Sequence, residues 1–144
     1  MAHIEDLGSQ FDAPIETVWK FINSPPDHGT SHTGRRNVKG EPAGENQMRI
    51  SWEQEVEGKW VKVDNHVTMF PPVAMLVHSK EGPLAGSKFM MWYKPNGAKT
   101  GVNVVGDFHS EMIPPAQLES MVLQSLAEAY DEDNAAIRRM AGKP

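Results

Sequence analysis

The sequence predicts an α+β fold, in which a run of antiparallel strands packs against one long C-terminal helix. Three observations support this. The last quarter, Pro115 to about Ala141, has helical spacing of its apolar residues; the middle alternates between apolar and polar residues; a short helical pattern follows the first strand. Strands followed by a helix are typical of α+β proteins. With 144 residues, the chain is expected to form a single domain spanning 1–144.

The C-terminal helix is predicted to begin at Pro115, because proline is well tolerated in the first turn of a helix. The residues of its apolar stripe recur at steps of three and four: Leu118, Val122, Leu126, Ala129, Asp133 and Ile137. Two arginines in the last turn and Gly142 just beyond fit a C-terminus near Ala141. Asp133 interrupts the stripe, so it either lies beyond the edge of the sheet or pairs with a base.

The N-terminal part predicts a strand over residues 3–12 and then a short helix. Pro14 suits the first helical position, and Ile15, Val18 and Ile22 have helical spacing. Two prolines after Ser24 end this helix. Residues 26–36 are polar and contain glycine, which predicts a loop with one helical turn.

The middle of the chain predicts six further strands joined by turns. They cover residues 36–41, 47–57, 60–70, 74–80, 87–94 and 100–112. Strand 47–57 alternates cleanly, as expected for a half-buried strand. Glu57-Gly58-Lys59 predicts a hairpin turn. Gly106, in the middle of the last strand, predicts a bulge or a sharp bend.

The composition excludes several classes of function. The net charge of −5 argues against nucleic acid or an anionic membrane as the main partner. The absence of cysteine excludes disulfides and thiolate chemistry and favours a cytoplasmic location. Neither a secretory signal nor an apolar run long enough to span a membrane is expected. Phosphate-binding loops and nucleophile-elbow motifs are also missing.

The segment Phe11-Asp12-Ala13-Pro14-Ile15-Glu16-Thr17-Val18-Trp19-Lys20-Phe21 resembles the opening of START-like (Bet v 1-like, SRPBCC) proteins. The hairpin at Glu57–Trp60, the turn-rich segment Glu81–Ser87 and the long C-terminal helix fit the same pattern. The resemblance implies a helix-grip fold, a curved seven-stranded antiparallel sheet around the C-terminal helix with an apolar cavity between them. This superfamily includes polyketide cyclases and aromatases, lipid carriers, ligand-binding plant allergens and co-chaperones.

On the helix-grip arrangement, the apolar sides of the strands and of the helix would line the cavity. The expected ligand-binding residues are Trp52, Val63, Val67, Met69, Leu76, Phe89, Met91, Tyr93, Val104, Phe108, Val122, Ser125, Leu126 and Ala129. Methionine and aromatic side chains form adaptable apolar pockets. The alternative is that these residues pack into a solid core, although Ser125 and Ala129 are small and leave room on the helix.

The first hypothesis is therefore a domain that binds a small hydrophobic or aromatic ligand, such as a lipid or a polyketide-like molecule, without metal or organic cofactor and as a monomer or weak dimer. The first alternative is a polyketide cyclase or aromatase-like enzyme using polar cavity residues as proton donors or acceptors. The candidates for that role are Asn65, His78, Tyr93, Asp107 and His109. The second alternative is a co-chaperone-like module that binds another protein through the outer sheet face.

His28 and His32 stand four residues apart, the helical spacing that can share a metal ion. Gly29 and Thr30 between them break the helix, and a third ligand is not indicated, so a metal site is not expected. Residues 26–36 are predicted instead to flank the cavity mouth as a lid.

Overall fold

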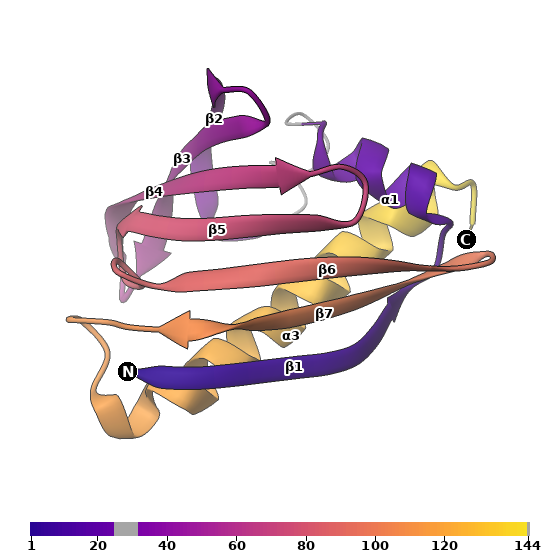
Figure 1. Ribbon diagram of the computed structural model, residues 1–144. Coiled ribbons are helices and arrows are strands. Elements are labelled where there is room, and N and C mark those ends of the chain that lie inside the picture. Colours follow the sequence, from indigo (N-terminus) through magenta and orange to yellow (C-terminus); the bar gives the residue numbers. More distant parts are fainter. Residues whose placement is uncertain (25–31, 144) are drawn as a thin grey trace.

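The computed structural model describes residues 1–24 and 32–143. One seven-stranded antiparallel sheet curves around a long helix, with a shorter helix beside it (Figure 1). The elements are β1 (Ala2–Phe11), α1 (Ile15–Ile22), β2 (Arg35–Gly44), β3 (Gln47–Val56), β4 (Lys59–Phe70), β5 (Ala74–Glu81), β6 (Lys88–Asn96), β7 (Lys99–Phe108) and α3 (Pro115–Met140). The predicted α+β helix-grip architecture is therefore confirmed.

The strand order across the sheet is β1-β7-β6-β5-β4-β3-β2. Strands β2 to β7 follow one another as neighbours, whereas β1 pairs with β7 at the opposite edge from β2. Figure 1 shows α3 crossing behind β1, β7 and β6, with its C-terminal end beside α1. The helix thus lies against the concave face of the sheet, and α1 covers the same face near one end.

The hairpin between β3 and β4 forms as the sequence predicts. Glu57 and Gly58 both have positive φ, at 50° and 78°, as the two central residues of a type I′ turn require. The last strand is shorter than predicted, because β7 ends at Phe108. Ser110 Oγ accepts hydrogen bonds from the backbone N–H groups of Met112 and Ile113, at 3.0 and 2.9 Å. That turn redirects the chain toward α3.

Of the bulge or sharp bend predicted at Gly106, the bulge is wrong, since β7 pairs with β6 in unbroken register through this residue, and the bend stays a prediction. Glycine is required at this position because β6 and β7 approach each other closely here. A Cβ atom at position 106 would lie 2.3 Å from the Cβ of Phe89 and 2.4 Å from the carbonyl oxygen of Lys88. Register breaks occur instead between Asp6 and Ser9 of β1, within β2, and between β4 and β5.

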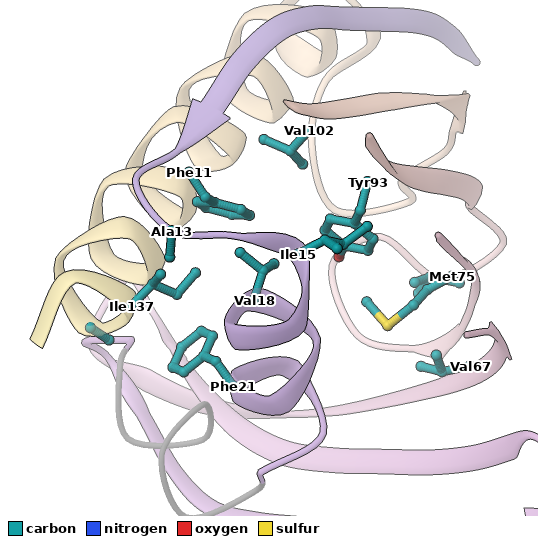
Figure 2. Packing of buried hydrophobic residues seen from close by; sticks show 12 residues of the cluster. Phe11, Ala13, Ile15, Val18, Phe21, Val67, Met75, Tyr93, Val102 and Ile137 are labelled. Atoms are coloured by element: carbon teal, nitrogen blue, oxygen red, sulfur yellow. The ribbon is translucent and has the colours of Figure 1, made fainter. Parts of the chain in front are cut away.

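The buried apolar residues fall into two separate clusters. The α1 cluster joins the first helix to β4–β7 and the end of α3 (Figure 2); it contains Phe11, Ala13, Ile15, Val18, Phe21, Val67, Met75, Val77, Tyr93, Val102, Ala136 and Ile137. The β1/β7 cluster joins the sheet edge to the start of α3; it contains Ile4, Val104, Phe108, Leu118 and Val122. Phe89 and Met91 are only partly buried and pack against both clusters.

Candidate functional site

The sheet register decides which strand side chains face α3. On β6, Phe89, Met91 and Tyr93 lie opposite Gly106, Val104 and Val102 of β7, on the concave face. The same face continues to the other edge of the sheet through Met75, Val77 and Ser79 of β5, Val63, Asn65, Val67 and Met69 of β4, and Met48, Ile50 and Trp52 of β3. Thirteen of the fourteen predicted ligand-binding residues belong to this face or to α3.

Leu76 is the exception and requires a correction. It is 37% exposed and lies directly opposite Met90 on the outer face, so it does not point at α3. Met75 and Val77 are the buried, inward-facing residues of β5. Residues 74–77 form an unbroken apolar run, so alternation could not indicate which side is buried.

Two of the polar candidates also lie on the outer face. His78 is opposite Lys88, and burial together with the nearby Lys80 and Lys88 lowers its pKa. Asp107 is opposite His3, and the two side chains are hydrogen bonded at 2.8 Å. Neither residue faces the concave side. The backbone of His109, beyond β7, is held by the Ser87 hydroxyl.

The other predicted ligand-binding residues differ in their exposure. The buried ones are Val63, Val67, Tyr93, Val104, Phe108 and Val122. The partly buried ones are Trp52, Met69, Phe89, Met91, Leu126 and Ala129. Ser125 is exposed. A uniformly filled core would bury all of these residues. The concave side therefore includes positions that are accessible to solvent.

The inner face of α3 is buried at its two ends and accessible in its middle. Leu118 and Val122 are buried near the start, and Ala136 and Ile137 near the end. Ser125 points within ~20° of the direction of Leu118 and of Ala136, at 100° per residue. Ser125 is nevertheless exposed, and Ala129, one turn on, is only partly buried. The middle of the helix is therefore not pressed onto the sheet as its ends are.

The backbone of α3 comes closest to β1, α1 and β7. All three contribute to the buried clusters, to which β4, β5 and β6 also contribute Val67, Met75, Val77 and Tyr93. Ile50 of β3 and Met69 of β4, on the far side of the concave face, are only partly buried. The backbone of the helix thus lies nearer to the β1/β7 half of the sheet than to the β3–β5 half.

A polar cluster lies where the chain enters β2. The imidazole of His32 places Nδ1 3.2 Å from Glu132 Oε1 and Nε2 3.1 Å from Asp133 Oδ1. Its side chain is only 5% exposed. The Glu132 carboxylate also accepts the backbone N–H of Thr33 at 2.8 Å. Asp133, the acid on the apolar stripe, therefore pairs with a base, one of the two outcomes that the sequence left open.

The electrostatics of this cluster follow from burial and hydrogen bonding. Burial raises the pKa of Glu132, but the hydrogen bonds from Thr33 and His32 outweigh it, so its pKa is lowered overall. Arg35, in the first position of β2, lies with its guanidinium carbon 4.3 Å from the centre of the Trp52 ring. Burial lowers the pKa of Arg35, while Asp133 and Glu132 oppose that shift.

Sequence reasoning missed this cluster. Its members come from residues 32–35 and from α3, about a hundred residues apart, and only tertiary structure brings them together. The residue types offered one weak signal, an acidic residue on an otherwise apolar helical stripe. The helical turn and the lid predicted within residues 26–36 fall largely on residues 25–31, outside the described part of the chain.

Two polar side chains on the concave face have poor hydrogen-bond partners. Tyr93 is buried, and its hydroxyl donates to the sulfur of Met91 at 3.8 Å, a weak acceptor. Burial raises the pKa of Tyr93, and the negative charge of Asp133 raises it further, so it is a neutral phenol at physiological pH. Asn65 Oδ1 is buried and has no hydrogen-bond partner among the described residues.

Within residues 1–24 and 32–143, no three His, Asp or Glu side chains are arranged to hold a metal ion. His28 lies outside that part. None of the helices in the described portion is both long and apolar enough to cross a membrane.

Comparison with known proteins supports the fold directly. Neither a protein-family model nor a curated protein matches the sequence. Solved structures do match. The ZhuI aromatase/cyclase from Streptomyces sp. R1128 superposes with a TM-score of 0.74 at 14% identity, covering 99% of both chains. The fold is that of the START-like, Bet v 1-like proteins.

Two further structures extend this likeness across the START-like fold. A START superfamily protein from Mycobacterium smegmatis gives a TM-score of 0.74 at 10% identity, covering 96% of this chain and 99% of that one. Ara h 8.0201 gives 0.69 at 13% identity, covering 99% of both chains. At these identities the likeness establishes the architecture, and function has to be argued from the site.

Proposed function

We propose that this START-like domain binds a small hydrophobic or aromatic molecule between the concave face of the sheet and the middle of α3. The observation that carries the proposal is the exposure of Ser125 on a helix face whose two ends are buried. The separation of the core into two clusters, with Phe89 and Met91 between them, supports it. Apolar surface that is accessible on a concave side is typical of ligand sites.

The composition of the proposed site favours an aromatic ligand. Phe89, Met91 and Met69 offer polarisable, adaptable contacts, and the partly buried Trp52 lies further along the same face. Arg35, Tyr93 and Asn65 add a few polar groups at fixed positions. Mostly apolar walls with a few directed polar groups are the usual composition of a small-molecule site.

Substitution of Ser125 by phenylalanine tests the proposal. The added ring would fill the space beside the middle of α3, so the protein should lose enhancement of 8-anilinonaphthalene-1-sulfonate fluorescence while keeping its circular dichroism spectrum. Ser120→Phe is the matched control. It is an exposed serine of the same helix, about 140° away around the axis. Equal dye binding by both variants would reject the site.

A cyclase-like enzyme is the second candidate, and Tyr93 favours it. A buried neutral phenol with only a thioether acceptor can donate a proton or a hydrogen bond to a reacting carbonyl. In reconstitution with a minimal polyketide synthase, the wild type would shift the aromatic products detected by mass spectrometry. Tyr93→Phe would lose that shift while still binding the dye. If the wild type leaves the products unaltered, the cyclase-like activity is excluded and ligand binding without catalysis remains.

A further inference from the structure

Asn65 carries a buried acceptor that no side chain or backbone group of residues 1–24 and 32–143 satisfies. Its Oδ1 atom is inaccessible to solvent and has no hydrogen-bond partner among the described residues. Buried polar atoms are nearly always paired, and leaving one unpaired is costly. An unsatisfied acceptor at this position therefore needs an explanation.

The position of Asn65 directs this acceptor to the concave side. It lies in β4 between two buried valines, Val63 and Val67, that face the same way. Its neighbours across the sheet are Ile50 of β3 and Ser79 of β5. The backbone of α3 comes closest to β1 and β7, on the other half of this face, so a bound molecule is a candidate partner for the acceptor.

We propose that Asn65 is a specificity-determining residue, whose side-chain oxygen accepts a hydrogen bond from a hydroxyl group on an otherwise apolar aromatic ligand. This inference rests on the proposed function and narrows its substrate class. Aromatic molecules without a donor would leave the acceptor unpaired in the complex, so they would bind less tightly. A site built to pair a hydroxyl discriminates against the analogue that lacks it.

Two probes of nearly equal size test the inference. 2-Naphthol carries a hydroxyl where 2-methylnaphthalene carries a methyl group. The wild type should bind 2-naphthol about tenfold more tightly, the difference that one additional hydrogen bond supplies. Asn65→Leu should abolish the preference, because it should weaken the binding of 2-naphthol and leave the binding of 2-methylnaphthalene unchanged. Asn96→Leu, at an exposed asparagine of β6, is the matched control and should keep the preference.

The possible outcomes distinguish a failure of this inference from a failure of the proposed function. If the wild type binds neither probe, the proposed function is contradicted. If it binds both equally, or if Asn65→Leu keeps the preference, the inference is overturned.

A measurement on the wild type alone covers the case in which Asn65→Leu does not fold. The side-chain amide resonances of Asn65 should shift on addition of 2-naphthol and stay in place with 2-methylnaphthalene. Identical shifts with both probes would contradict the inference.

Discussion

The two halves of the concave face differ in how they meet α3. Beneath β1 and β7, Ile4, Val104 and Phe108 close against the start of the helix, and Phe108 is only 1% exposed. On the β3–β5 side, Ile50 and Met69 are only partly buried, and Ile50 lies opposite Asn65, whose Oδ1 has no partner among the described residues. The β3–β5 side thus combines buried core residues, Val67, Met75 and Val77, with positions that are only partly buried. The proposed binding site depends mainly on those partly buried positions.

Two leucines of α3 give the largest expected contrast, between the buried start of the helix and its more accessible middle. Leu118 is 3% exposed within the β1/β7 cluster, whereas Leu126 is only partly buried. Leu118→Ala should lower the free energy of unfolding by about 3 kcal/mol, since it leaves a cavity in close-packed surroundings. Leu126→Ala should cost about 1 kcal/mol. Urea denaturation of both variants measures the difference, and equal losses would mean that the helix is packed evenly along its length.

Two glycines of β7 test the close approach of strands in the anchored half. Gly106→Ala would place a methyl group against backbone atoms of β6 and should cost about 1–3 kcal/mol, or prevent folding. Gly101→Ala is the control on the same strand, because its Cβ would meet Lys94 at an ordinary 3.5 Å. The midpoint temperature of thermal unfolding of Gly106→Ala should be well below that of Gly101→Ala. The reverse order would contradict the packing described for Gly106.

The polar cluster predicts a smaller, pH-dependent effect. The pKa of Glu132 is lowered in the folded protein, so its stabilising contribution is present above the ordinary carboxyl pKa of 4.5 and is lost as pH falls through the folded value. Glu132→Gln should therefore cost about 1 kcal/mol at pH 7. The difference from the wild type should shrink as the pH falls below 4.5 and through the lower pKa of the folded protein. Denaturation curves at several pH values measure this, and a gap that persists in acid would exclude the carboxylate as its source.

Much of the architecture followed from local patterns. The spacing from Leu118 to Ile137 predicted α3, the Pro14 region predicted α1, and the Glu57-Gly58 pair predicted the hairpin. Errors arose where local signals were equivocal. The apolar run of β5 gave no alternation, so Leu76 was assigned to the wrong face. The turn at Ser110 shortened β7, because a side chain captured backbone donors that a strand would have used.

By itself, the sequence determined the order of the helices and strands, and its resemblance to START-like proteins implied the helix-grip architecture. Hydrophobic periodicity and turn chemistry act over a few residues, so they can be recognised without a structure. Only the tertiary structure decided that α3 lies closest to β1, α1 and β7, that His32 reaches Glu132 and Asp133, and that Asn65 Oδ1 finds no partner in the described part of the chain. Those outcomes depend on contacts between distant segments, which a local pattern does not encode.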